Sequence, residues 1–124
     1  MKGYLVDVYG NGDARVVELE ATLEDYYKLL QCDCIDIAER QIDGVYFDVV
    51  CDDEGLLVDL PKISATDTDG SPMMCGNLLF LHDDGKGHEI GLSDKDINIL
   101  KMHTRKVSTR CYPEPYSIIT DMYF

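Results

Sequence analysis

The Asp43-Gly44 dipeptide separates two runs in which apolar and polar residues alternate. Alternate side chains of a strand point to the same side of a sheet, so Ile35 and Ile37 share one side. A tight turn between two strands needs positive φ, which Gly adopts without steric cost. The pattern therefore predicts a β-hairpin over residues 35–51, around which the other elements are arranged.

The segment before this hairpin predicts another hairpin and a helix. Strands are expected over residues 1–8 and 15–19, because a run dense in turn-forming residues separates them. Thr22 and Asp25 resemble a capping box, in which a hydroxyl and an acid satisfy free amides at a helix start. One helical face is expected to point to the core, with the residues Leu23, Tyr26, Tyr27 and Leu30.

The segment after the hairpin alternates extended, turn and helical signals. Ser93 and Asp96 predict the start of a second helix, with Ile97 and Leu100 facing inward and basic residues from Lys101 at its end. The other elements expected there are an extended segment over 56–61, a polar turn over 66–72, a buried strand over 75–82 and an exposed loop over 83–89.

These elements predict an α+β fold with a mostly antiparallel sheet, built from β-hairpins, and two short helices packed on one face. A chain of 124 residues has room for one domain and one core. Residues 1–110 are expected to form that domain. Residues 111–124 are expected to form a proline-containing tail that docks on the body or on a partner.

The cellular setting predicted from the sequence is a reducing cytoplasm. No apolar run approaches the roughly 20 residues that span a bilayer, and the first residues lack the features of a secretion signal. The odd number of cysteines follows no framework spacing, so free thiols are expected at Cys32, Cys34, Cys51, Cys75 and Cys111.

Negative charge is concentrated in the first hundred residues. The chain carries a formal net charge of −13, divided as −15 over residues 1–100 and +2 over residues 101–124. Such a field repels nucleic-acid phosphates and anionic membranes, which disfavours direct binding of either through the main body. It suits a basic protein partner, a cation or simple solubility.

Several short motifs occur in a characteristic order. They are Ile35-x-Ile37, an acidic corner over Cys51–Gly55, Pro61 followed by Ala65, an acidic turn over Asp67–Gly70, a Gly-x-x-hydrophobic strand over Gly76–Leu81, and Leu92-Ser93-Asp94. In these motifs the chain resembles the phage and gut-bacterial family catalogued as domain of unknown function 3846. The resemblance covers residues 1–103. It implies a mobile-element or prophage setting, but no activity and no functional residue.

The sequence contains no strong catalytic or metal-binding signature. Asp52, Asp53 and Glu54 offer carboxylates for a divalent cation, but the twelve-residue calcium-loop pattern is missing. Zinc ligands are conceivable among Cys32, Cys34, His82, His88 and His103, although their spacing is not that of a structural zinc site. No nucleophile, phosphate-loop or dinucleotide motif is present. We therefore expect neither enzymatic activity nor a cofactor.

Two functions remain open from the sequence. The first is a non-enzymatic protein that presents an acidic surface to a basic host protein, as a DNA-charge mimic or in an anti-defence role. Its expected patch comprises Asp36, Asp48, Asp52, Asp53 and Glu54. The second is a small-molecule sponge or regulator that holds a nucleotide-like anion in the cleft of a homodimer. Its expected donors are Lys101, Arg105, Lys106 and Arg110.

Overall fold

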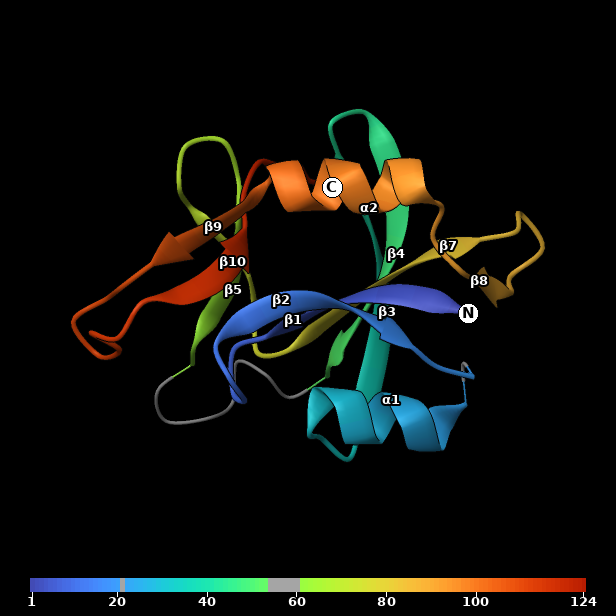
Figure 1. Cartoon of the computed structure of the whole chain (residues 1–124), viewed down its shortest axis with the longest axis horizontal. Coiled ribbons are helices and arrows are strands. Elements are labelled where there is room, and N and C mark those ends of the chain that lie inside the picture. The colour runs from blue at the N-terminus through green and yellow to red at the C-terminus, as the bar shows by residue number, and fades with distance from the viewer. Residues whose placement is uncertain (21, 54–60) are drawn as a thin grey trace.

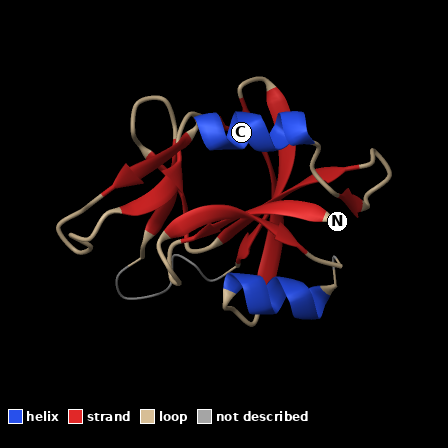
Figure 2. Ribbon diagram, viewed as in Figure 1, coloured by secondary structure: helices blue, strands red, loops and turns tan. Residues whose placement is uncertain are grey.

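The computed structural model describes residues 1–20, 22–53 and 61–124 (Figures 1 and 2). The elements within these ranges are, in order, β1 (Lys2–Asp7), β2 (Asp13–Glu18), α1 (Leu23–Leu30), β3 (Ile35–Ile42), β4 (Val45–Asp52), β5 (Ile63–Thr66), β6 (Pro72–Cys75), β7 (Leu78–Asp83), β8 (Glu89–Ile90), α2 (Asp94–Met102), β9 (Thr104–Val107), β10 (Tyr116–Ile119) and β11 (Met122–Tyr123). The extended segment predicted over 56–61 lies outside this description except for Pro61.

The hairpin predicted around Asp43-Gly44 is confirmed. Both turn residues have positive φ, 54° at Asp43 and 78° at Gly44, as a two-residue hairpin turn requires. Ile42 pairs with Val45 next to the turn, and the pairing continues without a bulge to Ile35 and Asp52. The short turn fixes this register, since each residue of β3 has one partner in β4.

The larger sheet is antiparallel throughout, and half of its described pairings join strands that are distant in the sequence. Its order is β11-β3-β4-β7-β1-β2, with β8 paired to β7. The predicted hairpin of β1 and β2 is confirmed, and β7 lies between β1 and β4. Strand β7 therefore joins the N-terminal hairpin to the central one.

The two helices cover opposite faces of this sheet (Figure 1). On one face Tyr26 and Leu30 of α1 pack with Leu79 of β7. On the other face Leu100 of α2 packs with Phe80 of the same strand. The predicted α+β class with mostly antiparallel hairpins is confirmed, but the prediction that both helices share one face is wrong. Because β7 is apolar on both sides, each side needs its own cover.

A second sheet lies beside α2 on the same side of the larger sheet. Its order is β6-β5-β10-β9, and β10 pairs antiparallel with β9 and parallel with β5. Tyr116 and Ile118 of β10 are buried in the core that also contains Leu100. Strand β11 joins the larger sheet next to β3. Residues 111–124 therefore contribute one strand to each sheet.

The helix starts follow the sequence signals to different extents. At α2 the Ser93 side chain accepts from the Asp96 amide and the Asp96 carboxylate accepts from the Ser93 amide, so this capping box is confirmed. At α1 Thr22 accepts from the Asp25 amide, but the Asp25 carboxylate accepts from Glu20 instead. That capping box is therefore only half formed.

The predicted inward face of α1 is only partly correct. Tyr26 and Leu30 are buried, whereas Leu23 is 59% exposed and Tyr27 36% exposed. An eight-residue helix on a sheet buries a narrow stripe, and the first-turn residue Leu23 lies beyond it. Neither described helix is long and apolar enough to cross a membrane.

The hairpin turn generates a stability prediction. A Cβ added at Gly44 would meet nothing within 4 Å, so substitution there tests the backbone angle alone. We expect Gly44→Ala to lower the free energy of unfolding by about 1 kcal/mol, because φ stays positive at this position. Urea denaturation measures the change. Asp43→Asn is the matched control and should be neutral, since Asn tolerates positive φ; equal stability of Gly44→Ala and the wild type would contradict this turn.

Candidate functional site

A groove opens where strands β4 and β7 diverge. The two strands pair from Cys51–Leu78 to Asp48–Leu81, and this pairing ends before His82 and Asp83 of β7. The resulting cavity has a volume of about 390 Å³. It is lined by Glu39, Tyr46, Phe47, Asp48, His82, Asp83, Gly85 and Gly87. We call this cavity the acidic groove.

Carboxylates from three strands converge on the acidic groove. Glu39 of β3 is the direct cross-strand partner of Asp48 of β4, which places two acids on the same face of the sheet. Asp83 of β7 also lines the groove, and its partner in β8 is Glu89. Like charges directly opposite each other destabilise a sheet, so this arrangement opposes folding.

Asp48 is the most buried of these acids. Its residue is 8% exposed, and its side chain forms no hydrogen bond or ion pair with any other described residue. Burial raises the pKa of Asp48, the charges of Asp83, Glu89 and Glu39 raise it further, and His82 acts in the opposite direction. Its carboxylate oxygens are not among the enclosed unpartnered atoms, so they face the groove, where a charged group of a ligand could reach them.

His82 forms a rigid wall of the groove. Its ring stacks on Phe47, with centroids 5.1 Å apart and planes 11° from parallel. Its Nε2 lies 2.9 Å from Asp96 Oδ2, the same oxygen that accepts from the amide and hydroxyl of Ser93. Burial alone would raise the pKa of Asp96, but the hydrogen bonds from His82 and Ser93 hold it below its ordinary value. The start of α2 thus fixes His82 beside the groove.

The negative field extends from the groove to α1. Burial and the charges of Glu89, Asp48 and Asp25 raise the pKa of Tyr26 to about 12. The Tyr26 hydroxyl is buried and has no hydrogen-bond partner among the described residues. This region of the α1 face therefore carries more negative charge than its own side chains neutralise.

The structure divides the acidic patch that the sequence predicted. Asp48 was expected to point outward, and this is wrong, because β4 lies between β3 and β7 and the residue is buried. Asp36 is exposed but pairs with Cys51, which puts it on the opposite face from Asp48. Asp52 and Asp53 lie at the far end of β4, and Glu54 is outside the described residues. Of the predicted residues, Asp48 belongs to the groove.

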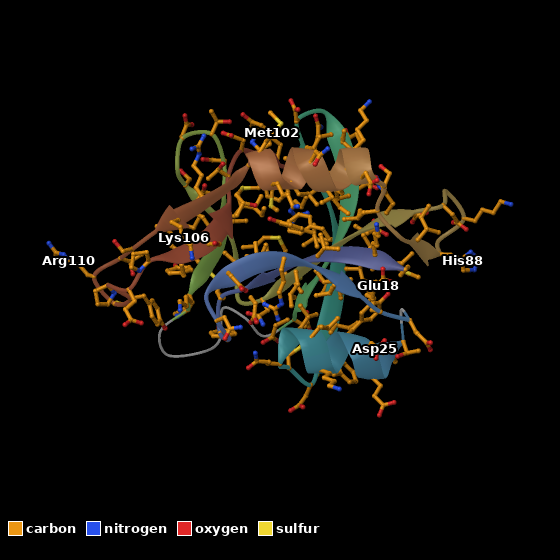
Figure 3. The ribbon with its side chains drawn as sticks, in the orientation of Figure 1. Glu18, Asp25, His88, Met102, Lys106 and Arg110 are labelled. Carbon is orange, nitrogen blue, oxygen red and sulfur yellow. The ribbon has the colours of Figure 1, made fainter. Side chains whose placement is uncertain are left out.

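The four predicted anion donors are also dispersed. Lys101 lies in the last turn of α2, and the helix ends at Met102 instead of continuing into the basic stretch. Arg105 and Lys106 are neighbours in β9, so their side chains point to opposite sides of the strand. Figure 3 shows Arg110 at the far end of the β9–β10 hairpin, beyond Lys106. These four residues do not form a shared cluster.

No metal site is evident in the part of the chain that the structure describes. No three His, Cys, Asp or Glu side chains are grouped there closely enough to hold an ion. The three histidines are each within hydrogen-bonding distance of a different aspartate: His82 of Asp96, His88 of Asp84 and His103 of Asp121. The groove carboxylates line the same cavity, but they are not close enough together to hold a metal ion.

Three residues that line the groove, Glu39, His82 and Asp83, were not predicted as groove residues from the sequence. One of the three had a usable signal. Once Asp43-Gly44 is taken as a two-residue turn, the register places Glu39 opposite Asp48. His82 and Asp83 had no such signal, because the pairing of β7 with β4 joins segments separated by more than twenty residues.

Comparison with known families places the chain in one of them. The family model described as Domain of unknown function (DUF3846) matches residues 1–105. The chain belongs to this family. The match includes every strand and loop of the acidic groove and ends within β9, so β10 and β11 of this DUF3846 protein lie outside it. No curated protein and no solved structure matches the chain.

The strained position of Asp48 generates a second prediction. We expect Asp48→Asn to raise the free energy of unfolding at neutral pH by about 1 kcal/mol, because it removes a buried charge facing Glu39, Asp83 and Glu89. The folded-state pKa of Asp48 is raised, so its charge opposes folding only at pH values above its ordinary, unfolded-state pKa.

The gain should therefore be absent at about pH 3, where Asp48 is protonated in both states, and should grow as the pH rises through its raised pKa. Urea denaturation of both proteins across this pH range measures it. A loss of stability in Asp48→Asn at neutral pH would show that the carboxylate has a stabilising partner.

Proposed function

We propose that this DUF3846 protein is a non-enzymatic binding protein whose acidic groove receives a lysine or arginine side chain of a partner protein. The observation that carries the proposal is Asp48, a residue that is 8% exposed, lines the groove and has no hydrogen-bond or ion-pair partner among the described residues. A cationic side chain entering the groove would relieve its repulsion with Glu39 and Asp83.

The lining of the groove suits a long cationic side chain better than a bare ion. Tyr46 lines the groove, is 54% exposed and lies on the same side of β4 as Asp48, so it provides aromatic surface beside the acid. Lysine and arginine pack their apolar stems on such surface while the charged end reaches an acid. An arginine would also stack on an aromatic ring as it pairs with the carboxylate. A metal ion, in contrast, needs several carboxylate oxygens at one point.

The charge of the whole body supports a basic partner. The −15 carried by residues 1–100 would attract a positively charged surface over a distance and speed its association. A protein that otherwise holds nucleic acid presents such a surface. We propose that the partner is a host protein of this kind. By mimicking the charge of DNA, the DUF3846 protein would occupy its basic surface and so act against host defence.

A peptide-binding measurement tests the proposal. We expect a fluorescently labelled peptide with alternating Arg and Ser residues to bind with an affinity that falls steeply as salt rises, and a Glu-Ser peptide not to bind. Asp48→Asn should weaken binding by about tenfold or more, because it removes a desolvated charge pair. Fluorescence anisotropy at several salt concentrations gives both quantities.

The matched control is Asp36→Asn, which removes the same charge from the opposite face of the sheet. It should change the affinity much less than Asp48→Asn. Equal losses in the two variants would mean that net charge alone attracts the peptide. Binding that does not respond to salt, or no binding, would contradict the proposal.

A further inference from the structure

A second cavity lies at the opposite end of the molecule from the acidic groove. Its volume is about 260 Å³, and its lining includes Pro61, Ile63, Arg110, Cys111, Tyr112 and Tyr116. We call it the tyrosine pocket. In Figure 3 Arg110 marks this end, and His88, in the loop bordering the groove, marks the other. The two cavities are therefore separate sites.

An ordered turn holds Arg110 at the tyrosine pocket. The amide of Thr109 donates to the carbonyl of Tyr112 at 2.9 Å, and the amide of Tyr112 donates to the Thr109 hydroxyl at 3.0 Å. These reciprocal bonds close the turn that carries Arg110 and Cys111. The turn therefore fixes the backbone of Arg110, while its exposed side chain extends outward at this end of the molecule (Figure 3).

The aromatic walls of the pocket are fixed from behind. The rings of Tyr112 and Tyr116 meet edge to face, with centroids 6.4 Å apart. The Lys62 ammonium lies 4.8 Å and 4.5 Å from these two ring centres and also donates to the Val8 carbonyl at 2.8 Å. This cation anchors both rings and adds positive charge next to the pocket.

The hydroxyl of Tyr116 is a buried polar group that forms no hydrogen bond with the other described residues. The residue as a whole is 2% exposed. Burial raises the pKa of Tyr116, and the nearby Cys75 and Tyr112 raise it further, so the hydroxyl remains a donor at neutral pH. A buried hydroxyl without a partner destabilises the folded protein, and an acceptor atom of a ligand would offset that cost.

We propose that the tyrosine pocket binds a small planar aromatic anion. The flat ring would lie between Pro61 and Ile63 on one side and the tyrosines on the other. Its carboxylate or phosphate would pair with Arg110, and a further acceptor atom would reach the Tyr116 hydroxyl. The volume is below that of a drug-sized site, so the ligand has one or two rings.

Charge and composition support this class of ligand. Residues 101–124 carry +2, whereas the rest of the chain carries −15 and repels anions. The apolar lining disfavours an inorganic phosphate, which needs several polar donors, and the arginine disfavours a neutral ring. A ring with one anionic group satisfies both parts of the pocket.

Titration calorimetry with two anionic probes tests whether the pocket binds an aromatic anion and whether it prefers a carboxylate or a phosphate. Indole-3-acetate presents a carboxylate and AMP presents a phosphate; indole and adenosine are their uncharged controls. We expect one anion to bind and its uncharged analogue to bind at least tenfold more weakly. Arg110→Ala should remove this preference, while Arg105→Ala, a basic residue exposed on β9, should retain it. Absence of binding by both anions at millimolar concentration would overturn the proposal.

The tyrosine hydroxyl has its own test. Tyr116→Phe removes an unpartnered group, so the free protein should keep or gain stability while the binding of the anion weakens by about tenfold. Tyr26→Phe is the matched control, because it removes another buried unpartnered hydroxyl on the α1 face. It should leave the affinity unchanged. Equal affinities of Tyr116→Phe and the wild type would overturn the assignment of this hydroxyl.

Two exposed cysteines give an independent readout of position. Cys111 lines the tyrosine pocket, and Cys34 precedes β3. A bound anion should slow the alkylation of Cys111 by iodoacetamide, measured by mass spectrometry, and leave the rate at Cys34 unchanged. Unchanged rates at both residues in the presence of saturating anion would place the ligand elsewhere. Asp48→Asn should not alter any of these results, which keeps this test separate from that of the acidic groove.

Discussion

The fold depends on the burial of β7 on both of its faces. Leu78 and Phe80 face one core and Leu79 and Leu81 the other. At roughly 25 cal/mol for each Å² of apolar surface removed from water, neither face can be left exposed in a domain of this size. One face is covered by α1, and the other by α2 together with the second sheet. This requirement explains why the C-terminal segment enters the core.

The acidic groove follows from the same arrangement. Strand β4 pairs with β7 over only part of its length, from Cys51 to Asp48, and the strands separate beyond this point. The divergence opens a space that the protein lines with Glu39, Asp48 and Asp83 in place of apolar residues. A chain selected only for stability would not place like charges opposite one another here. These like charges are the feature on which the proposed cationic partner rests.

The two cavities have opposite chemistry and lie at opposite ends of the molecule. The groove is built within the region that matches the DUF3846 family, over residues 1–105, whereas the tyrosine pocket takes Arg110, Tyr112 and Tyr116 from beyond it. Because the cavities are separate, the proposed cationic and anionic ligands would not compete directly for one site. A protein of this family that lacked the C-terminal strands would keep the groove residues and lose most of the pocket.

Local signals in the sequence determined the central hairpin with its register, the two helix starts and the buried β7 strand. They act between residues close in the chain, where turn geometry, capping and periodicity are decisive. The tertiary structure alone decided that the helices lie on opposite faces and that β10 enters a second sheet. It also decided that Asp48 is buried and lies on the opposite face of the sheet from Asp36. These features depend on pairings between distant segments, such as β4 with β7, and no local pattern specifies which strands meet. Asp48 was recognised from the sequence as an acid of interest, but its neighbours His82 and Asp83 reach it only through that long-range pairing.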